Sequence, residues 1–145
     1  MHDQIKDKQC PKCDHTCSMT SDMTKHIKVC TGRERMSAGE YAIKGVLEAM
    51  QVAFVREMRF HDCRDSYALP FDFYIPLLTV AIEYDGQQHF EAIEYFGGSE
   101  RFEVTKRHDA IKNQYCSDNG IKLLRIKYTD FEREELISAF LIANN

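Results

Sequence analysis

The sequence lacks any long apolar run, internal repeat or low-complexity stretch. A membrane-spanning helix needs about 20 consecutive apolar residues, so we expect no membrane span. The first ten residues, MHDQIKDKQC, also lack the apolar stretch of a secretory signal. We therefore expect a soluble, intracellular protein that is not secreted.

The sequence also lacks an excess of positive charge. Its net charge is -4, while 43% of its residues are hydrophobic and 11% aromatic, enough for a folded core. Residues 1–35 hold seven Lys or Arg against five Asp or Glu, and the remainder holds 12 against 18. This acidity argues against nonspecific backbone binding as the main activity, whereas an acidic patch that holds a divalent metal would produce the same imbalance.

Four of the seven cysteines and histidines in residues 1–35 have the spacing of a structural zinc site. Cys10, Cys13, His26 and Cys30 read C-x2-C-x12-H-x3-C, and a reducing compartment favours metal binding over disulfides. The spacing resembles the ββα zinc-finger family, with cysteine in place of the last histidine. We expect residues 1–35 to be a C2HC zinc finger with its linker. Sequence reading and simple anchoring to DNA or to a protein both remain open for it.

Residues 36–145 predict one α+β domain with the order αβββαβα. Helices follow from apolar residues at helical spacing and from capping signals, and strands from β-branched and aromatic runs. The expected helices are 38–51 and 100–118, with a last one capped by residues 129–130. The expected strands are 52–60, 69–76, 79–85 and 121–128.

Three acidic residues fall on the second and third expected strands. If residues 77–78 form a two-residue turn, paired positions sum to 155, so Asp72 lies opposite Glu83, with Asp85 diagonally behind. Like charges so placed repel each other, and a magnesium ion between Asp72, Glu83 and Asp85 would relieve this. The alternative is a solvated polar strand face.

A histidine follows this acidic group, because Asp85 begins the segment DGQQH and His89 ends it. An isolated histidine is usually structural, but beside three carboxylates it becomes a candidate general base for activating water. Lys112, Lys106 or Arg107 could hold a phosphate group.

Taken together, SAGEYAI, FDFYIP, IEYDGQQHF and KRHDAIKNQYCSDNGIKLLRIKY resemble the EDxHD endonucleases. These are phage homing enzymes related to the very-short-patch repair endonuclease. They belong to the PD-(D/E)XK, or restriction-endonuclease-like, superfamily, which has an αβββαβ core. The likeness covers residues 37–128. It implies functional roles for Glu40, Asp72, His89 and Asp109. The sequence departs from the superfamily where a lysine often follows the second acid, because Asp85 stands there.

Two of these assignments have structural alternatives. Glu40 lies three residues after Ser37 and would complete a helix capping box. Asp109 and Lys112 share one stripe of their helix, while an apolar stripe lies roughly opposite. If the apolar stripe packs on the sheet, Asp109 points outward.

The sequence thus predicts a zinc-finger-tethered, magnesium-dependent DNA endonuclease that hydrolyses phosphodiester bonds, with manganese as a substitute metal. The expected site residues are Glu40, Asp72, Glu83, Asp85, His89, Asp109 and Lys112. DNA is the expected partner, and a homodimer would serve double-strand cleavage. A noncatalytic DNA- or protein-binding module on the same fold and an RNA-directed nuclease remain as alternatives, as do homing, restriction, repair and recombination as biological roles.

Overall fold

The computed structural model describes residues 8–9, 16–17, 36–93 and 97–145. Contacts divide the chain into two units, Met1–Met36 and Ser37–Asn145, and each is described by itself. In the first unit, strands β1 (Lys8–Gln9) and β2 (Thr16–Cys17) pair antiparallel. The four expected zinc ligands, Cys10, Cys13, His26 and Cys30, lie outside the described residues.

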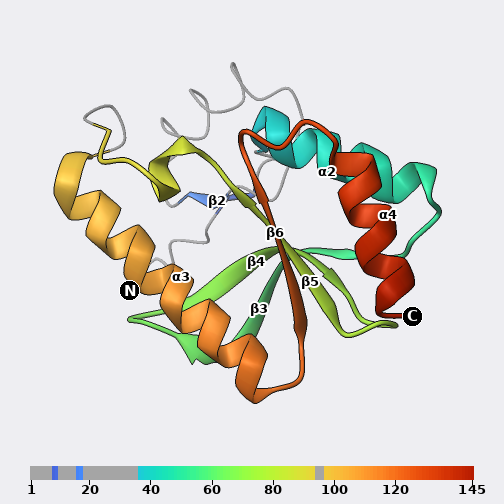
Figure 1. Ribbon diagram of the computed structural model, residues 1–145. Helices are drawn as coiled ribbons and strands as arrows, with labels where there is room; N and C mark the ends of the chain where they lie inside the picture. Colours follow the sequence, from blue (N-terminus) through green and yellow to red (C-terminus); the bar gives the residue numbers. More distant parts are fainter. Residues whose placement is uncertain (1–7, 10–15, 18–35, 94–96) are drawn as a thin grey trace. The chain divides into compact units, whose positions relative to one another are not determined.

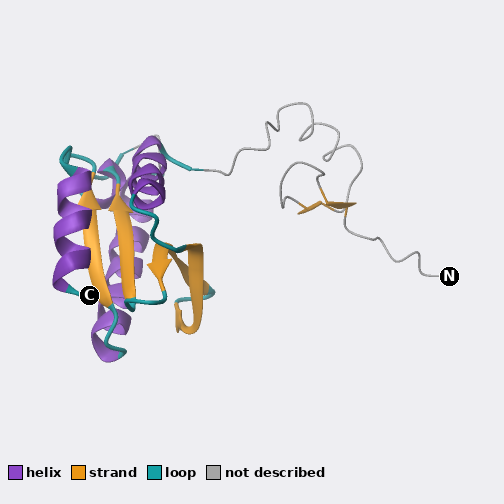
Figure 2. Ribbon diagram, turned by 90° about the vertical axis from the view of Figure 1, so that its right-hand side faces the viewer, coloured by secondary structure: helices purple, strands orange, loops and turns teal. Residues whose placement is uncertain are grey.

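The second unit is a four-stranded mixed sheet with helices on both faces (Figures 1 and 2). Strand order is β3-β4-β5-β6. The first three strands are antiparallel, and β6 runs parallel to β5 after the crossover through α3. The elements are α2 (Ala38–Ala49), β3 (Val55–Arg64), β4 (Ala68–Ile75), β5 (Val80–Asp85), the short 3-10 helix η1 (Gln87–His89), α3 (Gly98–Asp118), β6 (Lys122–Lys127) and α4 (Arg133–Ala143). The mixed α+β class and the expected element order are confirmed.

Helix α2 begins with the expected capping box. The Ser37 hydroxyl accepts a hydrogen bond from the Glu40 amide at 3.2 Å, and the Glu40 carboxylate accepts one from the Ser37 amide at 2.8 Å. These bonds satisfy amides that the first helical turn leaves without partners. Gly39 lies directly against the ring of Tyr84 on β5, where a Cβ atom would come within 2.1 Å of the ring. This close approach sets the start of α2 against the sheet and thereby positions Glu40.

The β4–β5 register is the expected one, because Phe73 pairs with Ile82, Tyr74 with Ala81 and Ile75 with Val80. Strict alternation along the expected strand 69–76 predicts that Phe71, Phe73 and Ile75 share one face of the sheet, and this prediction is wrong.

The correction to the β4 faces concerns Phe71. It packs in the cluster that includes Cys116 of α3, whereas Phe73 and Ile75 pack with α2 and α4. The change of face occurs at Asp72, whose Oδ2 accepts a hydrogen bond from the Tyr84 amide at 2.8 Å. Opposite it on β3, Glu57 has φ 50°, in the left-handed region.

Helix α3 turns its mixed polar stripe toward the sheet. Lys112 and Cys116 are buried, while Ile111 and Tyr115 pack at the margin of the same cluster. Asp109 therefore points toward the sheet, which decides between the two orientations left open by the sequence.

Most expected boundaries shift by a few residues, and two of the shifts have a clear local cause. Strand β3 begins at Val55 rather than 52, because the chain leaves α2 through Gln51 at φ 58° and the Val52 amide still bonds to the Leu47 carbonyl. Helix α4 begins at Arg133, because Asp130 accepts a hydrogen bond from the Lys127 amide at 2.8 Å and stabilises a turn rather than the helix.

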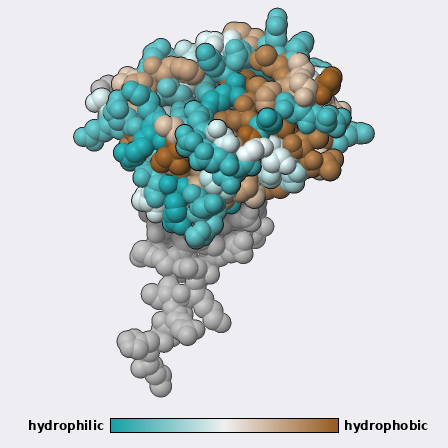
Figure 3. Space-filling view, turned by 60° about the horizontal axis from the view of Figure 1, so that its bottom comes forward, coloured by the Kyte–Doolittle hydropathy of each residue, from teal (hydrophilic) through white to brown (hydrophobic). Residues whose placement is uncertain are grey.

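None of the described helices is both long and apolar enough to cross a bilayer. Hydrophilic side chains cover much of the face drawn in Figure 3, and apolar ones gather toward its right-hand side. The exposed apolar side chains include Leu77, in the β4–β5 turn, and Ile142, near the end of α4.

Two glycines of α2 provide a matched test of the packing that positions Glu40. Gly39→Ala is expected to lower the free energy of unfolding, because the new methyl group displaces the Tyr84 ring. Gly45→Ala is expected to raise the free energy of unfolding by about 1 kcal/mol. Apart from the chain neighbours and the helix's own backbone, no atom lies within 4 Å of the added Cβ atom, and alanine favours the helix more than glycine does. Urea denaturation of both variants measures the two effects. An equal rise in the free energy of unfolding in both variants would contradict the close contact between Gly39 and Tyr84.

Candidate metal and hydrolytic site

The expected site residues gather at the end of β5 in two adjoining groups. The first is the carboxylate pair, Asp72 on β4 and Glu83 on β5, with Lys112 from α3. The Lys112 Nζ donates a hydrogen bond to Glu83 Oε1 at 2.8 Å, and both side chains are buried. Strand β5 is covered on both faces, so Glu83 is held away from water between the helical layers.

The carboxylate pair carries more negative charge than its surroundings easily hold. Burial, reinforced by the charge of Asp72, raises the pKa of Glu83 to about 8, even though Lys112 acts in the opposite direction. Burial also raises the pKa of Asp72, and Glu40 adds to that shift, while the hydrogen bond from the Tyr84 amide opposes it. The pair therefore favours either a proton or a bound cation.

Glu40 completes the expected capping box and also lies near the carboxylate pair. One carboxylate oxygen completes the capping box, and the other, Oε1, lies 3.5 Å from Nη2 of Arg56 on β3. The same carboxylate is close enough to Asp72 to raise its pKa. The group has three acids, Glu40, Asp72 and Glu83. It has two cations, Arg56 and Lys112, so one negative charge is in excess when all five side chains are ionised.

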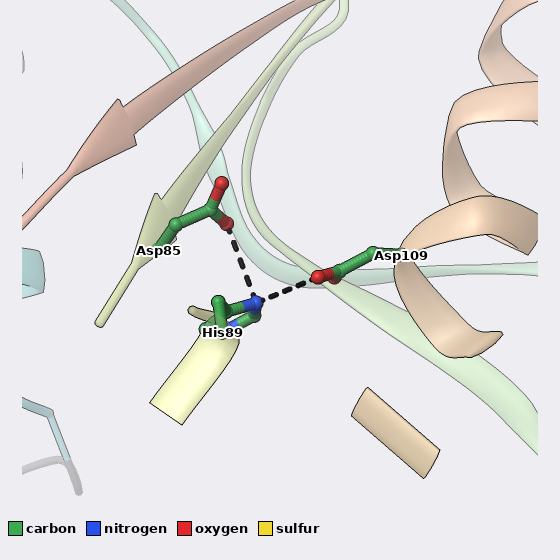
Figure 4. Close-up of side chains that lie close together, drawn as sticks. All are labelled: Asp85, His89 and Asp109. Atoms are coloured by element: carbon green, nitrogen blue, oxygen red, sulfur yellow. Dashed lines mark hydrogen bonds and ion pairs between the residues drawn. The ribbon is translucent and has the colours of Figure 1, made fainter. Parts of the chain in front are cut away.

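The second group is the histidine cluster, Asp85, His89 and Asp109 (Figure 4). The His89 Nδ1 lies 2.8 Å from Asp109 Oδ2 and 3.6 Å from Asp85 Oδ1. Three elements supply these side chains: the end of β5, η1 and α3. With Nδ1 donating to a carboxylate, Nε2 is the nitrogen left to accept a proton.

The two carboxyl groups of the histidine cluster have opposite pKa shifts. Burial raises the pKa of Asp85, although Arg125 and His89 oppose the shift. Burial also acts to raise the pKa of Asp109, but the hydrogen bond with His89 and the charge of Arg125 together hold it below its usual value. The lowered pKa of Asp109 favours its ionised form, which orients the imidazole ring.

Arg125 of β6 contacts both carboxylates of the histidine cluster. Its Nη1 lies 2.7 Å from Asp85 Oδ1 and 3.5 Å from Asp109 Oδ1, and its Nε donates a hydrogen bond to Asn113. The guanidinium occupies space between the two carboxylates and neutralises part of their charge, which makes this cluster less attractive to a cation.

Two expected roles require correction. The three expected magnesium ligands, Asp72, Glu83 and Asp85, are not gathered as one group; among the described residues, only Asp85, His89 and Asp109 bring three potential ligand atoms within 4.8 Å of one another. The reason is that Arg125 and His89 hold Asp85, the last residue of β5. Lys112 was expected to be able to hold a phosphate group, but it is buried against Glu83.

Sequence reasoning missed Arg125 and Arg56. Arg125 had a detectable signal, because it interrupts the otherwise apolar LLRI segment of a strand. A cation on a strand buried beside acidic strands needs a carboxylate partner. Arg56 lies on the edge strand β3, where a charged side chain is ordinary, so its ion pair with Glu40 had no comparable signal.

Three viral proteins are similar to part of the chain. Uncharacterized protein 307L of Invertebrate iridescent virus 6 is 34% identical over 65 residues, which cover 44% of this chain and 33% of that protein. Uncharacterized protein 094L of Frog virus 3 is 41% identical over 64 residues, 43% of this chain and 41% of that protein. Uncharacterized protein 033L of Invertebrate iridescent virus 3 is 27% identical over 62 residues, 42% of this chain and 32% of that protein.

The chain therefore spans about a third to two-fifths of the length of these relatives, and their names state no activity. No protein-family model matches the chain, and no solved structure matches it. The argument for function consequently depends on the chemistry of the site.

The charge imbalance at the carboxylate pair makes a prediction about stability and pH. Because Asp72 and Glu83 have folded-state pKa values above their unfolded ones, the stability of the fold decreases as pH rises from about 4 to about 8. Asp72→Asn removes one of the two charges. It should therefore raise the free energy of unfolding by about 1 kcal/mol or more at pH 8 and have little effect near pH 4.

Urea denaturation with EDTA at the two pH values measures this difference. Asp118→Asn, at the exposed end of α3, is the matched control and should change stability little at either pH. A loss of stability in Asp72→Asn that is the same at pH 4 and pH 8 would contradict the proposed repulsion.

Proposed function

We propose that this chain is a divalent-metal-dependent DNA endonuclease that hydrolyses phosphodiester bonds. The observation that carries the proposal is the juxtaposition, at the end of β5, of two groups: the carboxylate pair, of which Glu83 is buried, with its excess negative charge, and a histidine oriented by an aspartate. The first group suits a cation and the second suits proton transfer. A nuclease that activates water with a histidine and stabilises the phosphate charge with a metal uses both at one place.

His89 is the proposed general base. Its Nδ1 hydrogen bond to Asp109 leaves Nε2 as the nitrogen that takes a proton from the attacking water. Asp109 holds the ring in this tautomer and stabilises the imidazolium that forms, as carboxylates do in other histidine-dependent hydrolases. Arg125 keeps Asp85 and Asp109 in place and limits their mutual repulsion.

Asp72 and Glu83 are the proposed metal ligands, with Glu40 close enough to contribute through water. The fit is supported by the donor set, because carboxylate oxygens are the ligands that Mg²⁺ and Mn²⁺ prefer. It is also supported by the charge excess and by the raised pKa values of the pair. A bound Mg²⁺ would polarise the phosphate and stabilise the charge that develops on it. Lys112 limits repulsion within the pair and stabilises the ionised form of Glu83.

The resemblance to the EDxHD endonucleases agrees with this assignment. It implies roles for Glu40, Asp72, His89 and Asp109, which meet in the two groups of the site. The element order of residues 37–128 is also the αβββαβ order that the resemblance implies. DNA is proposed as the substrate on the same resemblance, and RNA is an outcome that the assay below distinguishes.

A structural zinc ion is proposed for the first unit, held by Cys10, Cys13, His26 and Cys30. Three thiolates and one imidazole are a donor set that structural zinc sites use. About 30 residues bury too little apolar surface to fold unaided, so the metal would supply the missing stability. The unit would then tether the hydrolytic domain to DNA or to another protein.

The activity can be tested with supercoiled plasmid and with a structured RNA of similar length, each in Mg²⁺, Mn²⁺ or EDTA. We expect conversion of the plasmid to nicked or linear forms with either metal and none with EDTA. His89→Ala should lower the rate by about 10²- to 10⁴-fold, the usual contribution of a general base. Asp72→Asn should reduce it to background.

The control for the histidine variant is His61→Ala, because His61 is an exposed histidine on β3 outside both groups. It should leave the rate unchanged. Full activity of Asp72→Asn, or plasmid binding without cleavage in any divalent metal, would overturn the nuclease proposal. Faster cleavage of the RNA would reassign the substrate.

The zinc proposal has its own measurement. Elemental analysis of the purified chain should give one zinc per molecule, and Cys13→Ser should lower this value to near zero while the domain of residues 37–145 keeps its thermal unfolding transition. Cys63→Ser, a change at a buried cysteine of β3, is the control and should retain the zinc. Full zinc content in Cys13→Ser would refute the assignment of ligands.

A further inference from the structure

A cavity of about 310 Å³ adjoins the histidine cluster and has no part in the chemistry described above. His89, Asp109 and Lys112 line one side of it. The rest of the wall comes from Tyr67 and Leu69 at the β3–β4 hairpin, Arg101, Thr105 and His108 of α3, and Gln88 of η1. A substrate held at His89 therefore has a recess of defined size beside the reacting group.

Tyr67 is the most accessible ring in this cavity. Tyr67 is 49% exposed, and among the described residues its ring contacts the ring of His108. The two ring centroids are 5.9 Å apart, with the planes at 85°. A perpendicular neighbour supports the tyrosine without stacking on it, so Tyr67 can accept a planar group of a ligand.

The hairpin that carries Tyr67 is tied to α3. Asp65 Oδ2 lies 2.9 Å from His108 Nε2 and 2.9 Å from Arg107 Nη2, while the Asp65 amide bonds to the Tyr67 carbonyl. These bonds hold Tyr67 beside His108 at the cavity wall before any ligand arrives, which lowers the entropic cost of binding.

Polar groups on the remaining wall suit a nucleotide. Arg101 and Thr105 are four residues apart on α3 and therefore lie on one face of the helix, near its N-terminal end, where a phosphate is favoured. The Gln88 amide can both donate to and accept from the edge of a base. The exposed Tyr67 ring supplies the apolar surface against which a base packs.

We propose that this cavity receives one unpaired nucleotide of the DNA strand that is cut, with its base stacked on Tyr67 and its phosphate near Arg101. The inference rests on the proposed function and adds a substrate class to it: DNA with a single-stranded or bulged nucleotide at the cleavage position. A volume near 300 Å³ is at the lower end of small-ligand pockets, so it suits one nucleotide rather than a stack of base pairs. Removing a base from a duplex costs energy, least where the base is already unpaired.

The test uses three fluorescent substrates of one sequence: a fully paired duplex, the same duplex with a one-nucleotide bulge, and the single strand. Each is cut by the full-length protein in Mg²⁺, and kcat/KM is measured. We expect the bulged and single-stranded substrates to be cut at least tenfold more efficiently than the duplex. Equal values for all three would overturn the proposal.

Variants separate base stacking from other effects. Tyr67→Ala should lower kcat/KM on the unpaired substrates by about 5- to 150-fold, the range that loss of one stacking ring gives. Tyr67→Phe should remain near wild type, and Arg101→Ala provides a second test if Tyr67→Ala is poorly folded. Leu77→Ala, an exposed change in the β4–β5 turn, is the control and should have no effect. Unchanged kcat/KM in both Tyr67→Ala and Arg101→Ala would overturn the proposal.

A binding measurement distinguishes failure of this inference from failure of the nuclease proposal. A single strand that contains 2-aminopurine is titrated with protein in EDTA, and fluorescence quenching that Tyr67→Ala abolishes would support the base site without any cleavage. If no substrate is cut while this quenching persists, the nuclease proposal fails and the nucleotide site stands. If DNA is cut but quenching is absent, the nuclease proposal stands and the nucleotide site is wrong.

Discussion

The burial of Glu83 between two helical layers, with the half-buried Asp72 beside it, is the constraint around which this domain is arranged. A carboxylate in the interior of a protein needs a cation or a proton, because burial disfavours its charged form. Strand β5 is covered by α2 and α4 on one face and by α3 on the other, so water cannot serve Glu83. Lys112 supplies one counter-charge at 2.8 Å, and it does not suffice to bring the pKa of Glu83 below about 8.

The unusual packing of α3 follows from this requirement. A helix whose apolar stripe alone faced the sheet would leave Glu83 without a partner, and α3 instead turns Lys112 and Cys116 inward. The same rotation brings Asp109 to His89, so one helix orientation serves both the carboxylate pair and the histidine cluster. Arg125 completes the arrangement from the neighbouring parallel strand, where its register places it beside Glu83.

Local signals in the sequence were enough to predict much of the framework. The two-residue turn predicted the β4–β5 register, and the Ser37 and Glu40 pair predicted the capping box, because both depend on residues close in sequence. The change of face at Asp72 was not predictable, since it depends on the Tyr84 amide of another strand. The separation of Asp85 from the carboxylate pair likewise depends on Arg125, which is 40 residues away.

The charge excess at the carboxylate pair also explains why the nuclease proposal and the stability of the fold are linked. Carboxylates placed to bind a cation repel one another when no cation is bound. The site therefore lowers the stability of the fold that carries it, as functional sites often do. Binding of a divalent cation should therefore release protons from the pair as it stabilises the fold.

Calorimetric titration of the protein with Mn²⁺ near pH 7, in two buffers of different ionisation enthalpy, tests this claim most directly. Our account predicts saturable binding of Mn²⁺ with measurable proton release, and loss of both in Asp72→Asn. Binding that is unaffected by this substitution, or the absence of saturable binding in the unmodified protein, would contradict it.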